Sequence, residues 1–211
     1  LAAHIALAYV HFDDFKIDSP LFELFWNTPS ESRHYEFVSF IGRSCLTREQ
    51  AGDDWFKANN VSVKKLIEFW DWVISTNIDI EPKVFSGFGI WINPEKEIID
   101  DKIVVKNLVK TLEKSEGGLD WDYGLTKRLK TFAEKDPVGT LEIVRNFLLY
   151  DGKLNSHRRA PLFSLDNEIK EALEVIYENT SLKSVVEDLI DILIREGSST
   201  FWGLKDILDS K

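Results

Sequence analysis

Apolar residues recur at helical spacing along nearly the whole chain. In one stretch they are Val63, Leu66, Ile67, Trp70, Val73 and Ile74. These six side chains fall on a single stripe of a helix, and the same pattern returns at 103–112, 141–148 and 185–193. A half-buried strand would need a sustained alternation of apolar and polar residues, which is hardly found. The sequence therefore predicts an all-α fold.

Residues typical of helix starts and ends divide this pattern into segments. Ser19 before Pro20 and Asp136 before Pro137 each place a side-chain acceptor at the N-cap and a proline at the first helical position. Glycines that follow apolar runs, Gly152 among them, are expected to end helices with positive φ. We expect about nine to eleven helices, near residues 1–12, 20–27, 30–45, 62–76, 82–92, 100–115, 121–135, 137–150, 165–178, 182–196 and 199–209.

Two segments of the C-terminal half resemble one another. LKTFAEKD at 129–136 and LEVIYENT at 173–180 share their apolar positions, their Glu and a capping residue, at an offset of 44 residues. Helix pairs that recur at this interval are typical of stacked antiparallel hairpins, as in HEAT and armadillo superhelices. A compact irregular bundle is the alternative that the sequence leaves open.

The D-P-x-x-x-L-x-x-V pattern from Asp136 to Val144 and the paired amphipathic helices resemble the HEAT/armadillo-like helical arms at the C-terminal side of large bacterial multidomain proteins of ATPase or defence type. The resemblance covers about residues 60–209 and rests on packing motifs. It implies a recognition or assembly surface and no catalytic residue. We accordingly expect one helical-repeat domain over residues 1–211, a fragment of a larger protein, with a sub-boundary near 46–61.

Charge and cysteine content limit the setting and the partners. The formal net charge of −10 disfavours a nucleic-acid partner, because phosphate backbones would be repelled. Cys45 is the only cysteine, which indicates a reducing, cytoplasmic location. No apolar run approaches the roughly 20 residues that span a bilayer. We therefore expect a cytoplasmic protein without membrane contact.

The stretch DGKLNSHRRAPLFS at 151–164 gathers basic residues in an acidic chain and shows no helical period. Arg158 and Arg159 could clamp a phosphate or carboxylate. Lys153 adds positive charge in the same stretch, and His157 adds charge at lower pH. In the alternative interpretation, which we favour, the loop packs on the helices while its arginines pair with surface acids. Contact with an anion or a nucleic acid through residues 151–163 is thus a secondary hypothesis.

Acidic and aromatic residues mark two further candidate binding positions. Asp120, Trp121 and Asp122 interleave acids with an aromatic ring, a pattern that can grip a basic partner. Trp72 lies about 200° around the helix from Trp70, so it faces either a partner or the neighbouring hairpin. A pocket formed by Trp72 and Trp91 with Trp121 and His157 would instead suit a helical enzyme or a small-molecule binder.

The remaining patterns assign no chemistry. His4 and His11 are about 10 Å apart along a helix, too far to share a zinc ion, and the other histidines belong to no ligand motif, so we expect neither metal nor cofactor. The GFGIW segment at 87–91 lacks the rest of a dinucleotide fingerprint and favours close helix packing. We therefore expect a non-catalytic protein-protein interaction or scaffolding domain.

Overall fold

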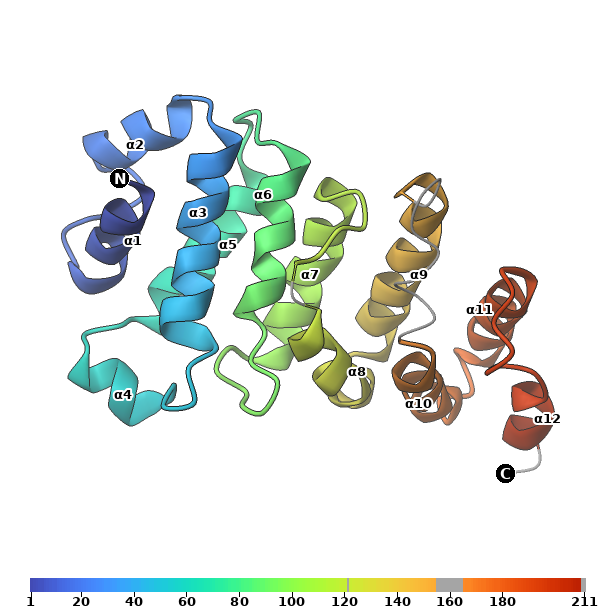
Figure 1. Ribbon diagram of the computed structural model, residues 1–211. Helices are drawn as coiled ribbons and strands as arrows, with labels where there is room; N and C mark the ends of the chain where they lie inside the picture. Colours follow the sequence, from blue (N-terminus) through green and yellow to red (C-terminus); the bar gives the residue numbers. More distant parts are fainter. Residues whose placement is uncertain (121, 155–164, 210–211) are drawn as a thin grey trace. The chain divides into compact units, whose positions relative to one another are not determined.

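The computed structural model describes residues 1–120, 122–154 and 165–209, with the side chains of 149–154 and 209 left outside the description. Within these ranges the chain forms twelve α-helices and no strand, which confirms the predicted all-α class (Figure 1). It divides into two compact units, residues 1–125 and 126–211.

Unit 1 contains the first seven helices and two short helical turns. The α-helices are α1 (Ala2–His11), α2 (Pro20–Asn27), α3 (Glu31–Ile41), α4 (Asp53–Ala58), α5 (Val63–Ser75), α6 (Pro82–Ser86) and α7 (Asp101–Lys114). A π-helical turn η1 (Gly42–Leu46) follows α3, and a 3₁₀ turn η2 (Gly87–Trp91) follows α6. The division between the units falls within α8 (Tyr123–Lys135).

Aromatic rings form the core of unit 1. Of the stripe predicted for α5, Leu66, Trp70, Val73 and Ile74 are buried and Val63 and Ile67 are half-buried. Phe69, which the predicted stripe did not include, is also buried and lies at the centre of the cluster, with its ring centroid 5.1 Å from that of Phe37 and 5.6 Å from that of Tyr9. Because α3 packs against α1, α6 and both short turns, Phe37 links the rings of several elements. Burial of large rings is the main source of stability here.

The predicted helix starts are confirmed at some positions and wrong at others. Asp136 accepts a hydrogen bond from the Gly139 amide at 2.9 Å and caps α9, as expected. Pro20 begins α2 as predicted. The Ser19 hydroxyl does not cap this helix, because it accepts a hydrogen bond from the Lys16 amide, 2.8 Å away, instead. Gly152 does not end a helix, since α9 continues through it to Leu154.

The GFGIW segment is packed against a neighbouring backbone. A Cβ atom at Gly89 would lie 2.2 Å from the carbonyl oxygen of Asp120, and one at Gly124 would lie 1.9 Å from that of Ile92. Both positions need glycine, because no side chain fits in these distances. The close packing predicted for this segment is confirmed.

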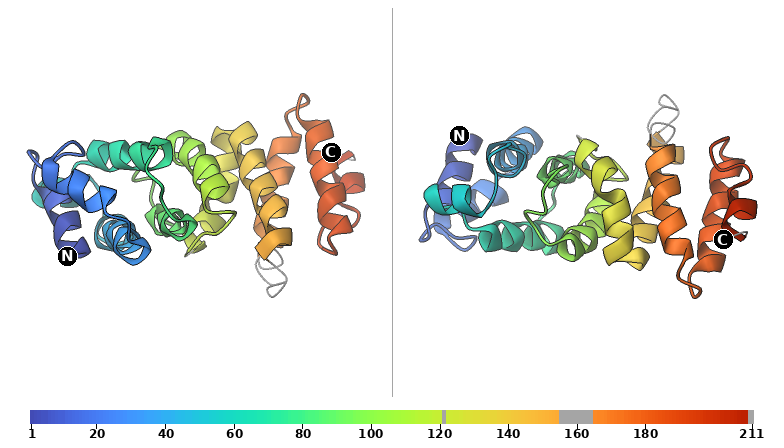
Figure 2. Two further views of the ribbon diagram at one scale, coloured as in Figure 1. Left: turned by 90° about the horizontal axis from the view of Figure 1, so that it is seen from above. Right: turned by 90° about the horizontal axis from the view of Figure 1, so that it is seen from below.

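Unit 2 contains α9 (Pro137–Leu154), α10 (Asp166–Tyr177), α11 (Lys183–Arg195) and α12 (Leu204–Asp209), together with most of α8. Helix α10 lies beside α11 in Figure 1 and in both views of Figure 2, and it also contacts α9. On α11 the predicted apolar stripe is buried at Val186, Leu189, Ile190 and Leu193. In the described part of the chain, no helix is both long enough and apolar enough to cross a membrane.

Candidate functional site

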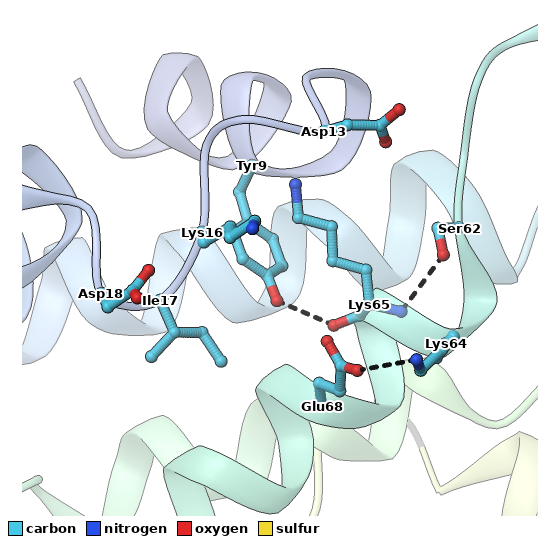
Figure 3. Close-up of a pocket in the computed structure, with 9 residues that line it drawn as sticks. All are labelled: Tyr9, Asp13, Lys16, Ile17, Asp18, Ser62, Lys64, Lys65 and Glu68. Carbon is cyan, nitrogen blue, oxygen red and sulfur yellow. Dashed lines mark hydrogen bonds and ion pairs between the residues drawn. The ribbon is translucent and has the colours of Figure 1, made fainter.

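A pocket of about 350 Å³ opens in unit 1 where the end of α1 and the turn after it meet the start of α5 (Figure 3). Charged side chains form most of its rim, Ile17 provides apolar surface, and the buried Tyr9 lies beneath them. The residues that line it are Tyr9, Asp13, Lys16, Ile17, Asp18, Ser62, Lys64, Lys65 and Glu68. This pocket is the candidate site.

Tyr9 fixes α1 against α5. Its side chain is 1% exposed, and its hydroxyl donates a hydrogen bond to the carbonyl oxygen of Lys65 at 2.8 Å. Burial raises the pKa of Tyr9, and the nearby carboxylate of Glu68 raises it further. The hydroxyl therefore stays protonated and remains a donor over the physiological pH range.

Lys65 is placed by the capped first turn of α5. The Ser62 hydroxyl accepts the Lys65 amide at 3.3 Å, so Ser62 acts as the N-cap of this helix. The Lys65 ammonium donates to the carbonyl oxygen of Phe12 at 2.8 Å and lies 4.6 Å from the ring centroid of Tyr9. Its stem thus crosses the gap between α5 and the end of α1, as Figure 3 shows.

The charge on Lys65 is poorly compensated. The pKa of Lys65 is lowered, and burial is the largest cause. The carboxylates of Asp13 and Glu68 raise this pKa, whereas the positive charge of Lys16 lowers it further. Among the described residues, no carboxylate oxygen lies within 4.0 Å of the ammonium of either Lys16 or Lys65. Glu68 is instead paired with Lys64 at 3.6 Å.

Asp120, predicted as a binding residue, anchors its loop to α6. Its carboxylate accepts hydrogen bonds from the Lys83 ammonium at 2.7 Å and from the Ser86 hydroxyl at 3.0 Å, and Tyr35 donates a further hydrogen bond to it. Burial alone would raise the pKa of Asp120, but these hydrogen bonds outweigh it and hold the pKa below the ordinary aspartate value. Burial and the same carboxylate raise the pKa of Tyr35 to about 12. Asp120 is therefore a fully partnered structural contact of unit 1.

The predicted aromatic residues do not gather at the pocket. The half-buried Trp72 ring packs against Phe22 and Trp26 of α2, with centroids 5.4 Å apart in both pairs. Trp91 is 2% exposed and donates its indole N–H to the Val38 carbonyl at 2.9 Å, so its ring belongs to the core. Asp122 is half-buried, and Trp121 lies outside the described residues.

The basic stretch after α9 can be followed only in part. Its first residues belong to α9, so the expectation that residues 151–164 lack helix is wrong for 151–154. The helix runs on because glycine inside a helix costs only about 1 kcal/mol relative to alanine. The side chain of Lys153, and residues His157, Arg158 and Arg159 altogether, lie outside the described part of the chain.

The histidines have packing and surface positions. His34 is buried, stacks on Trp26 with ring centroids 4.3 Å apart, and meets the Phe25 carbonyl through Nε2 at 3.1 Å. Burial lowers the pKa of His34, so its ring is neutral at pH 7. His11 meets the Asn59 carbonyl at 2.7 Å. In the ranges that the structure describes, no three residues of the metal-binding types are grouped around one point.

Lys65 and Tyr9 were not among the residues predicted from the sequence, although one local signal was present. Lysines in the first turn of a helix oppose the macrodipole, and the first turn of α5 contains Lys64 and Lys65 and no acid. Comparison with protein-family models, curated proteins and solved structures gives no match for this chain.

Proposed function

We propose that the chain is a non-catalytic helical domain that docks another protein, or another domain of its parent protein. The observation that carries this proposal is a set of large apolar side chains exposed on α1, on α2 and at the residue that follows α1. They are Leu7, Phe12, Leu21 and Leu24. Exposed apolar groups of this kind are typical of interaction surfaces.

Helix α2 is apolar on two faces. Phe22 and Trp26 are fully buried, and the ring centroids of Phe22 and Tyr9 are 5.4 Å apart, so this contact joins α2 to α1. Leu21 and Leu24, one helical turn apart, are 52% and 65% exposed. A surface helix normally presents polar residues outward, so these leucines fit a partner better than they fit water.

A stacked-hairpin architecture of HEAT/armadillo type is the arrangement that we propose for the helices of the chain. It is supported in unit 2 by the contacts of α10 with both α9 and α11, the helices before and after it in the chain. The offset of 44 residues between the two similar segments also agrees with it. In such folds each hairpin buries one side on its neighbours and presents the other.

Affinity capture with matched variants tests the docking proposal. We expect Leu21→Glu combined with Leu24→Glu to lose a partner that wild type retains, because two charges would be buried in an apolar interface. Val138→Glu, at a position on α9 that is 57% exposed, is the control and should retain it. The partner is then purified and its affinity measured by calorimetry. Equal affinity for wild type and the double variant, with both proteins folded by circular dichroism, contradicts the proposal.

A further inference from the structure

The first turn of α5 concentrates positive charge at one wall of the pocket in Figure 3. Lys64 and Lys65 occupy this turn, where the helix macrodipole is already positive and acidic residues are favoured. Two lysines at this end destabilise the helix, so helix formation does not explain why they are there. An anion in the pocket would supply that reason, because it is attracted both by the lysines and by the helix end.

Lys16 brings a second ammonium group to the same pocket from the turn that follows α1. It lies close enough to Lys65 to disfavour the charged form of that side chain, beyond the larger effect of burial. Neither lysine has a carboxylate oxygen within 4.0 Å in the part of the chain that the structure describes. The Lys65 ammonium satisfies one of its three donors on the Phe12 carbonyl, so further donors are available to a ligand.

The size and the charge of the pocket limit what that ligand can be. A volume of about 350 Å³ suits a small molecule, and the half-buried side chain of Ile17 offers apolar surface to its body. Asp13, Asp18 and Glu68 also line the pocket, and the whole chain carries a net charge of −10. A polyanion such as a nucleic acid would be repelled, whereas one oxyanion beside the lysines would not.

We propose that this pocket binds a small organic molecule through one carboxylate or phosphate group, which Lys65 and Lys16 contact while the half-buried Ile17 packs against its apolar part. The site lies on α1, the following turn and α5, and its lining includes none of the exposed leucines of α2. Failure of the docking proposal therefore leaves this one intact, and the reverse also holds.

Calorimetric titration of the whole chain with three probes of similar shape tests the proposal. Benzoate carries a carboxylate, phenyl phosphate carries a phosphate, and benzamide is neutral. We expect at least one of the two anions to bind with a Kd of about 1 mM or tighter, and benzamide to bind at least about tenfold more weakly. Whichever of the two anions binds more tightly shows whether the pocket prefers a carboxylate or a phosphate. Equal binding of benzamide, or no heat from either anion, overturns the proposal.

Variants assign the binding to the lysines. Lys65→Met and Lys16→Met should each raise the Kd of the more tightly bound anion by about tenfold or more. Lys65→Arg keeps the charge, so its Kd for that anion should stay within about threefold of the wild-type value. Lys106→Met, which removes the same charge from α7 outside the pocket lining, is the matched control and should change nothing. If Lys65→Met fails to fold, the exposed Lys16 provides the decisive variant. Unchanged affinity in Lys16→Met then overturns the proposal.

Discussion

Replacing Gly124 with alanine should destabilise unit 1, even though alanine is the better helix former. Gly124 is in the first turn of α8, and a Cβ atom there would lie 1.9 Å from the carbonyl oxygen of Ile92 and 2.8 Å from its carbonyl carbon. Ordinary van der Waals contact begins at 3.4 Å. The start of α8 and the segment after η2 would therefore have to separate by roughly 1.5 Å, in a close-packed interior.

Two opposing effects set the magnitude of this change. Alanine gains up to about 1 kcal/mol over glycine from helix propensity. Overpacking costs about 1 to 3 kcal/mol or more, and the upper end applies because the atom that is struck belongs to the backbone and cannot rotate away. The expected net loss in the free energy of unfolding is about 2 kcal/mol.

Urea unfolding followed by tryptophan fluorescence measures this loss, because Trp26, Trp70 and Trp91 are buried in unit 1. The matched control is Gly87→Ala, whose Cβ would meet a methyl group of Val38 at 3.2 Å. A side chain can shift by a few tenths of an ångström, so the control should cost less than about 1 kcal/mol. A Gly124→Ala protein as stable as wild type, or more stable, would refute the reasoning, because the clash would then not outweigh the gain in helix propensity.

Three other substitutions or treatments test contacts in unit 1. Asp120→Asn should lower the free energy of unfolding by about 1 to 2 kcal/mol at pH 7, a modest loss because the contacts of Asp120 with Lys83 and Ser86 are partly exposed. The pKa of Asp120 is lowered in the fold, so the stability that its carboxylate contributes is present above the ordinary aspartate pKa near 4 and is lost as the pH falls through the lower folded value. The unfolding free energies of wild type and variant, measured in urea, should therefore converge at acid pH. Thr111→Val should cost about 1 to 3 kcal/mol in the same assay, because it leaves the buried indole N–H of Trp70, now bonded to the threonine hydroxyl at 3.0 Å, without an acceptor. Burial raises the pKa of the Cys45 thiol to about 11, so iodoacetamide at pH 8 should modify it slowly in the folded chain and rapidly in urea; equal rates would contradict the burial.

Local signals in the sequence predicted most of the helices. The apolar stripe of α5, the proline at the start of α2 and the cap at Asp136 all depend on residues within a few positions of one another. Helix α4 was missed because its six residues are too few to show a period. Ser19 was misread because its hydroxyl has two local choices, and the chain uses the turn rather than the helix.

The candidate pocket could not be predicted in the same way, because long-range contacts build it. The Tyr9 hydroxyl and the Lys65 carbonyl are 56 residues apart, and the Lys65 ammonium and the Phe12 carbonyl are 53 apart. A long-range contact also decides the role of Asp120. The acidic and aromatic residues around it in the sequence indicated a surface for a basic partner, but in the fold the ammonium of Lys83, 37 residues earlier in the chain, pairs with its carboxylate. Charge patterns along a chain thus mark candidates, and only the fold decides which of them keep their charge available.

Asp120 and Lys65 show how that decision separates a structural contact from a binding position. Both side chains are partly buried, and burial disfavours the charged form of each. For Asp120 the surrounding donors more than offset this penalty, so the fold already completes its interactions and a ligand would gain little by approaching it. For Lys65 the surroundings leave the charged form disfavoured, with a carbonyl oxygen as hydrogen-bond partner and a second lysine nearby. An anion that entered the pocket would give the Lys65 ammonium an oppositely charged partner, as Lys83 gives one to Asp120.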